Sequence, residues 1–246
     1  MERNGLWWGD GGRTCVVPWG VAAILILIGY LSATMQPAAA DDALEARQLV
    51  ERAQLTIESF AADANMGAVR DLLSKARGVF IAPQVLRGAF VIGASGGSGV
   101  FLARDDKARQ WSEPAFYTVG GVSFGLQAGG EASEVVLLVM SERGVSALQG
   151  SNIKLGADAS IAVGPVGAGV AGATAALSAD IISFSRAKGL YGGISLDGSV
   201  VAVRDSWNSA YYGKSVTPTD ILVRRTVSNP QSASLIAAVA KVSSPR

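Results

Sequence analysis

Glycine is concentrated in the middle of this 246-residue chain, and this constrains the fold more than any other feature of the sequence. Sixteen of the thirty glycines lie between Gly93 and Gly172, in a region where many short segments have the two-residue period of β-strands. Glycine inside a strand marks a bulge or a place where another backbone or a ligand comes close. The pattern therefore predicts a curled, partly closed sheet, with no regular repeat beneath it.

The links between these strand segments are short, which favours antiparallel pairing. Two turns stand out. Gly96-Gly97 is expected to close a hairpin that begins at residues 90–92, and Asp197-Gly198 is expected to close another between two later strands. The segments with strand character are 90–92, 100–102, 115–119, 122–127, 135–140, 159–163, 166–171, 180–186, 191–196 and 199–204.

The flanking sequence has the 3.6-residue period of helices. Together with the strands, it predicts an α+β fold in which N-terminal helices pack on a glycine-rich, mostly antiparallel curled sheet and a C-terminal helix closes the chain. The apolar face of the first helix suits either a membrane surface or the sheet, and we expect the sheet, because most such stripes face a core. The expected helices span residues 42–62, 66–76, 141–148, 205–212 and 230–242, with caps at Asp41 or Asp42, Asn65 and Asn229.

The first forty residues have the anatomy of a signal peptide. A polar start precedes an apolar run at 16–31, and Ala38 and Ala40 form the small-residue pattern of a cleavage site. Cleavage after Ala40 would release an exported chain, periplasmic or secreted, whose residues 41–246 form one domain without a thiol, because Cys15 is the sole cysteine. The alternative is a retained membrane anchor, although sixteen apolar residues fall short of the ~20 that span a bilayer.

The chain contains no histidine, which excludes Ser-His-Asp and Cys-His catalytic sites and histidine-ligated metals. Matches to G-x-S-x-G (93–97, 121–125), G-x-G-x-x-G (167–172) and S-x-x-K (151–154, 185–188) are attributed to composition or lack their partner motifs. The net charge of +1 argues against a nucleic-acid binder. We expect no catalytic residue, metal ligand or cofactor, and hence no enzyme.

Several blocks of the sequence, taken in order, resemble the SYLF domain family. They are residues 74–83, 93–104, 111–115, 154–167, 183–198 and 208–213, and the resemblance spans about 42–241. It implies a lipid-binding domain. Eukaryotic members bind phosphoinositides, partly through an N-terminal amphipathic helix, and some bind actin filaments. Bacterial members are exported, often as lipoproteins, and actin binding is not expected of such a protein. This chain departs from the family because it has no lipoprotein cysteine and its expected first helix is not polybasic.

A headgroup site is expected among basic residues beside aromatic or glycine-rich segments, because arginine holds phosphate oxygens and tyrosine suits a lipid interface. For each residue the alternative is a solvated charge with a packed stem. The predicted function is recognition of anionic phospholipid or phosphoinositide-like headgroups at a membrane surface of the bacterial envelope. The alternative is a structural or protein-interaction module of the envelope with incidental lipid affinity. The candidates are Lys75, Arg77 and Arg87; Arg186, Lys188 and Tyr191; and Tyr211, Tyr212 and Lys214.

Overall fold

The computed structural model describes residues 38–89, 92–105, 107–124, 129–164, 178–187, 190–191 and 196–244, and those from Ala39 onward belong to one unit. Most of the predicted signal peptide, with Cys15, lies outside the described residues. Its last three residues begin the first helix, α2 (Ala38–Ala62), so the predicted cleavage point after Ala40 falls within a helix. Cleavage itself stays a prediction.

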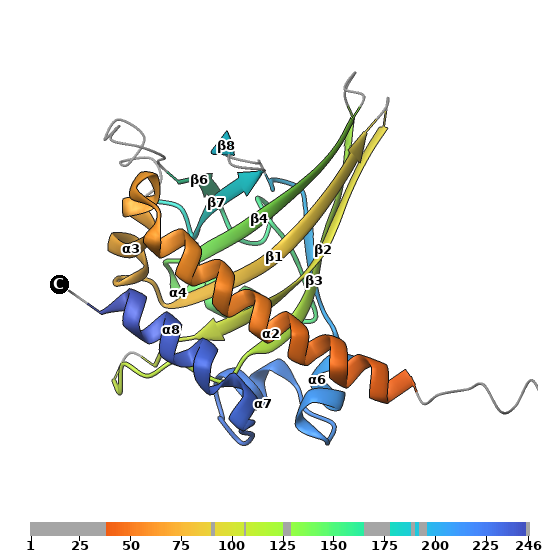
Figure 1. The fold of residues 1–246 in the computed structure, drawn as a ribbon, viewed down its shortest axis with the longest axis vertical. Helices are drawn as coiled ribbons and strands as arrows, with labels where there is room; N and C mark the ends of the chain where they lie inside the picture. The colour runs from red at the N-terminus through yellow and green to blue at the C-terminus, as the bar shows by residue number, and fades with distance from the viewer. Residues whose placement is uncertain are drawn as a thin grey trace, which may run out of the picture. The chain divides into compact units, whose positions relative to one another are not determined.

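Helix α2 packs one face against the sheet (Figure 1), as its spacing predicts. It begins at Ala38 rather than at residue 42, so Asp41 does not cap its start. Asp41 instead lies in the first turn, where its negative charge interacts favourably with the positive end of the helix dipole. The expectation that the apolar face belongs to the core is confirmed. Five residues of that face are buried: Leu49, Val50, Ala53, Ile57 and Phe60.

A short 3₁₀ turn, η1 (Ala64–Met66), leads into α3 (Gly67–Leu73), where the sequence predicts one helix over 66–76. The cap is Asp63 and not Asn65, since the Asp63 carboxylate accepts the backbone N–H of Asn65 at 2.9 Å. The prediction was therefore wrong by two residues in the cap and by three at the end of the helix.

The described strands form a nine-stranded sheet in the order β5-β9-β3-β2-β1-β4-β7-β6, with β8 beside β7. All pairs are antiparallel except β6 with β7, and the sheet curls (Figure 1), which confirms the predicted α+β class. The strands are β1 (Gly78–Ala89), β2 (Ile92–Ala103), β3 (Ala115–Phe124), β4 (Gly129–Val139), β5 (Asn152–Lys154), β6 (Ile161–Val163), β7 (Ile181–Ala187), β8 (Leu190–Tyr191) and β9 (Val200–Val203).

The predicted hairpin at Gly96-Gly97 is wrong. Strand β2 runs through both glycines, and the register pairs Ala89 with Gly93, so the chain reverses between β1 and β2 instead. Gly97 is required for another reason: a Cβ there would overlap the carbonyl oxygen of Gln84, where β1 bulges. The two strands expected at 115–119 and 122–127 likewise form the single strand β3.

The turn at Asp197-Gly198 is present, with Gly198 in the left-handed region at φ +79°, but it does not join paired strands. The strand after it, β9, pairs with β3 and β5, whereas β8 pairs with β7. The predicted hairpin is wrong because turn chemistry specifies a reversal and not the strand that completes the ladder. The strand expected at 166–171 lies outside the described residues.

The remaining helices follow the sequence closely. Ser141 caps α4 (Glu142–Gln149) through the N–H of Gly144, and α6 (Asp205–Tyr212) has the predicted bounds. Asn229 caps η3 (Pro230–Ser232), which continues into α8 (Ala233–Ser243). Helix α7 (Pro218–Leu222), which has a capping box between Thr217 and Asp220, was not predicted from the sequence. Among the described helices, none is long and apolar enough to cross a bilayer.

Two apolar clusters lie on the two faces of the sheet. Alternate residues of the central strands divide between them, as Ile81 of β1 belongs to the first cluster and Phe80 to the second. The first includes residues of α2, α3, α6 and α8, and the second includes residues of α4, α7 and β9. Helices thus cover one face of the sheet. The other face is covered by two short helices and by the outer strands, because the sheet curls around it.

Candidate functional site

A groove of about 1020 Å³ lies where the C-terminal ends of α2, α3 and α8 meet. Figure 1 shows α3 and the end of α8 side by side at one end of α2. Small apolar side chains form part of its wall, including Ala61, Ala62 and Ala238. The charged residues that line it are Glu58, Arg70, Asp71, Lys75 and Lys241.

The three basic side chains of this groove differ in what they contact. Arg70 donates a short hydrogen bond from Nη1 to the carbonyl oxygen of Ala61, which is one of the last carbonyls of α2. Lys75 and Lys241 form no ion pair with any described carboxylate. The groove therefore presents two ammonium groups that are able to bind an anion, beside an arginine already committed to the helix end.

The first predicted group of residues is not brought together. Lys75 lines the groove, whereas Arg77 lies 3.2 Å from Glu142 at the start of α4, from Nη1 to Oε1. Arg87 is ten residues further along β1, on the order of 30 Å away at the rise of a strand. Neighbours in sequence are therefore distant in space here, because an extended strand separates them.

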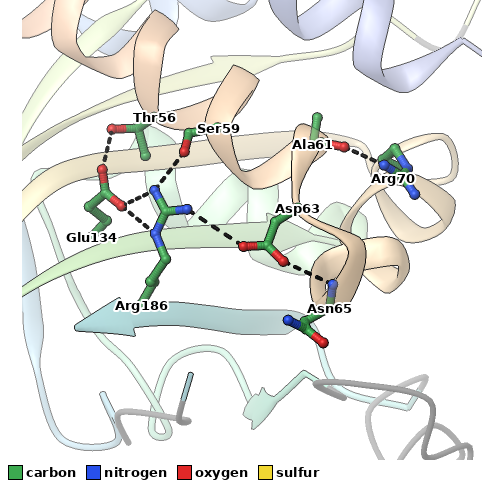
Figure 2. A network of polar contacts seen from close by, with 8 residues as sticks. All are labelled: Thr56, Ser59, Ala61, Asp63, Asn65, Arg70, Glu134 and Arg186. Carbon is green, nitrogen blue, oxygen red and sulfur yellow. Dashed lines mark hydrogen bonds and ion pairs between the residues drawn. The ribbon is translucent and has the colours of Figure 1, made fainter. Parts of the chain in front are cut away.

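Arg186, from the second group, is enclosed by a polar network that joins the sheet to α2 (Figure 2). Its Nε donates to Glu134 Oε2 of β4 at 2.8 Å, and Nη2 contacts the same oxygen more closely. Nη2 also donates to Ser59 Oγ at 2.7 Å, and Nη1 lies 3.9 Å from Asp63 Oδ2. Every nitrogen of the guanidinium thus has a protein partner.

The surroundings of Arg186 place this network between the sheet and α2 and not in an open binding site. The guanidinium carbon lies 5.0 Å from the centroid of the Phe60 ring, and the side chain is only 17% exposed. Glu134 also accepts from Thr56 Oγ1 at 3.4 Å, so both sides of the pair contact α2. Lys188 lies outside the described residues. For Tyr191, the structure describes only backbone pairing opposite Arg186.

The third group belongs mainly to the core. Tyr211 is 5% exposed, and the centroid of its ring lies 4.9 Å from that of the Phe116 ring. Tyr212 donates its hydroxyl to the carbonyl oxygen of Pro114 at 2.7 Å. Burial, followed by the nearby charge of Glu113, raises the pKa of both hydroxyls well above the usual range. Lys214 is exposed and donates to the carbonyl of Thr226 at 3.3 Å.

Two basic residues of the groove, Arg70 and Lys241, were not predicted from the sequence. Each lies in the last turn of its helix, where basic residues favour the negative end of the helix dipole. That signal was available, but it indicates only a helix end and not that three helix ends meet. Within the described residues, no three carboxylate or cysteine side chains gather in a way that could hold a metal ion.

Comparison with known proteins gives a consistent family. A family model described as "Las17-binding protein actin regulator" matches residues 120–242, which is half of the chain. The chain is 34% identical over 153 residues to SH3 domain-containing YSC84-like protein 1 of Bos taurus, covering 61% of this chain and 44% of that protein.

Two further relatives show the same relationship. The protein of the same name from Xenopus laevis is 36% identical over 145 residues, covering 58% of this chain and 43% of the relative. Protein YSC84 of Saccharomyces cerevisiae is 33% identical over 159 residues, covering 63% and 33%. The matched part is less than half of each of these relatives. The chain belongs to the Ysc84 family, which confirms the resemblance to SYLF domains that its sequence motifs carry.

Proposed function

We propose that this chain is a non-enzymatic lipid-binding domain that recognises anionic headgroups at a membrane surface. The observation that carries the proposal is the groove between α2, α3 and α8, where Lys75 and Lys241 face solvent without an ion pair among the described residues. Apolar side chains such as Ala238 and Val242 lie beside them. A phosphate with an attached acyl chain has this combination of charge and apolar surface.

Electrostatics set the expected strength of this binding. A lysine near an anionic membrane surface contributes about 1 kcal/mol, so Lys75 and Lys241 together account for roughly a 30-fold preference for anionic lipid. Glu58 and Asp71 also line the groove, and their negative charge opposes an anion. Binding through the groove is therefore expected to be weak, reversible and sensitive to salt.

Vesicle sedimentation tests this directly. Wild type should pellet with phosphatidylcholine vesicles that contain phosphatidylserine, and K75E/K241E should lose the component of binding that depends on phosphatidylserine. The matched control K107E/K154E changes the same charge at two exposed lysines outside the groove and should bind as wild type does. Equal loss in both variants would mean that net charge, and not the groove, determines binding.

The non-enzymatic and exported parts of the proposal have separate tests. The absence of histidine from the sequence removes the commonest general base. Turnover of a substrate that disappears on changing one serine or carboxylate would contradict a purely binding role. Export to the bacterial envelope depends on the signal-peptide pattern alone, and mass spectrometry of the processed chain should show Asp41 as its first residue.

A protein-binding function is the second candidate, favoured by the description of the family as Las17-binding actin regulators. On this view the domain contacts a protein, in the envelope or elsewhere, and lipid affinity is incidental. Co-sedimentation with actin filaments and a binding measurement with Las17 distinguish the two candidates. Saturable binding to either protein, unaffected by vesicles and by K75E/K241E, would favour the second.

A further inference from the structure

Strands β1–β4 extend past helix α2 at one end, with no helix drawn over them (Figure 1). On the side of the sheet that α2 covers elsewhere, this end exposes large apolar side chains: Leu86 is 55% exposed and Val122 is 75% exposed. The residues around them have small side chains or none. Exposed on this face are Leu86, Gly88, Ala94, Gly96, Val122 and Gly130.

The register places these residues on one face. Ile81 packs in the helix-side cluster, but β1 bulges between Ile81 and Gln84, and Val85 packs in the opposite cluster. Leu86 therefore returns to the helix side. On β3, Phe116 belongs to the helix-side cluster, and Val122 follows it by an even number of residues.

Cross-strand pairing brings the two apolar residues close together. Leu86 pairs with Gly96, and Val122 pairs with Ala94, two residues away on β2. The two side chains thus share one small patch.

On the face that carries Leu86 and Val122, this end of the sheet has no charged residue among those that the structure describes. Residues 88–103 and 115–130 contain no Asp, Glu, Lys or Arg, in a chain that is 17% charged. Arg87 and Glu131 also belong to this end, where they are paired in register on adjacent strands. They lie on the opposite face from Leu86, since strand neighbours alternate. The face with Leu86 and Val122 thus complements the apolar acyl layer just beneath the charged headgroups of a bilayer.

The backbone of the central strands also suits a layer with little water. β1 pairs with β2 and β4 as far as Ala89, and β2 pairs with β3 as far as Ile92. These N–H and C=O groups are satisfied within the sheet, so the cost of removing them from water is small. In the described ladders, β3 pairs with β9 only as far as Gly120, and β4 pairs with β7 only from Ser133 onward. Nearer the tip, the outer edges of β3 and β4 have no partner strand in these ladders, and this limits entry to the interfacial layer.

We infer that the uncharged face at this end of β1–β4 enters the interfacial layer of a lipid bilayer; this rests on the proposed lipid-binding function and adds an apolar surface to the basic groove that carries it. From Leu86 to the end of β1 is three residues, or about 10 Å, which matches the 5–10 Å that interfacial elements enter. A protein partner is less suited, because the exposed residues named above include no Trp, Tyr or Arg, the side chains that anchor protein interfaces.

The test uses the full chain and vesicles of phosphatidylcholine alone and with phosphatidylserine. L86D/V122D should reduce partitioning into both kinds of vesicle at least about tenfold, because each substitution removes an apolar side chain that the bilayer would bury. The control L55D/V223D alters two apolar residues of similar exposure, 64% and 53%, on α2 and after α7, and should bind as wild type does. L86T/V122T, which retains strand propensity, should show a smaller loss in the same direction.

A site-specific readout keeps the result independent of folding. In a C15S background, a polarity-sensitive dye on V122C should brighten with vesicles, and the same dye on L55C should not. Wild type that binds no vesicle would overturn the proposed function, and this inference with it. Wild-type binding with L86D/V122D unchanged and the V122C dye silent would overturn this inference alone. So would a dimer that V122D dissociates, because the face would then bind a second copy.

Discussion

Two basic regions of this molecule look alike in sequence and differ in structure. Arg186 has all its nitrogens committed to Glu134, Ser59 and Asp63 and lies over Phe60, so it connects β7 to β4 and α2. Lys75 and Lys241, at the helix ends, have no ion pair among the described residues. A basic residue beside an aromatic one is thus as suited to holding the fold together as to holding a ligand, and its partners decide which.

The largest effect on stability is expected of Arg186→Ala. Removal of the guanidinium leaves Glu134 and Asp63 without their counter-charge at 30% and 14% side-chain exposure, so the free energy of unfolding should fall by about 3 kcal/mol. Urea denaturation measures this. E134Q/R186Q, which removes the pair together, should cost less than the sum of the single changes. A loss below about 1 kcal/mol for Arg186→Ala would mean that the network does not support α2.

The opposite result is expected of K75E/K241E. Its unfolding free energy should stay within about 0.5 kcal/mol of wild type, because both lysines are exposed and form no ion pair with the described residues. Its binding to vesicles with phosphatidylserine should fall by at least roughly 30-fold, because each change removes a positive charge and adds a negative one. Urea denaturation measures the stability, and vesicle-binding curves at two salt concentrations measure the binding. If stability falls as much as in Arg186→Ala, the lysines are structural too.

Asp180 provides a polar cluster of intermediate strength. A hydrogen bond from Ser141, followed by bonds from Ser160, lowers the pKa of this carboxyl despite partial burial. Because the folded pKa lies below the unfolded value, its stabilisation is fully present above about pH 4 and is lost as the pH falls through the folded pKa. Asp180→Asn should therefore lower the unfolding free energy by about 1.5 kcal/mol at neutral pH and progressively less in acid.

An acid titration of the two unfolding curves measures that convergence. If the difference in unfolding free energy between wild type and Asp180→Asn does not change with pH, the negative charge of Asp180 does not contribute to stability.

The smallest effect is expected at Arg77. Its pair with Glu142 is exposed, at 34% and 79% of the two side chains, and screening by solvent reduces such pairs to about 0.2–1 kcal/mol. Arg77→Ala should therefore be nearly neutral in thermal unfolding, and it should bind vesicles as wild type does, since it does not line the groove. Loss of vesicle binding would extend the binding surface to α4.

Local patterns predicted the helices well and the strand pairing poorly. The bounds of α6 and the buried face of α2 follow from periodicity and capping, which act over a few residues. The Gly96-Gly97 hairpin failed because glycine serves equally in a turn and beneath a close carbonyl, and only the β1 bulge at Gln84 distinguishes the two. For the candidate site, Lys75 was foreseen, but Arg70 and Lys241 were not, because the groove needs α8, near the end of the chain, beside α2 and α3.

The sequence by itself determined the α+β class, the apolar face of the first helix, the exclusion of histidine chemistry and the family. These depend on composition, on local period and on ordered motifs, all of which are properties of short stretches. Only the tertiary structure decided which basic side chains are held in ion pairs and which are available to bind an anion. Glu134 is 52 residues from Arg186 and Ser59 is 127, and no local signal specifies a pair that long-range strand order and helix docking bring within hydrogen-bond distance.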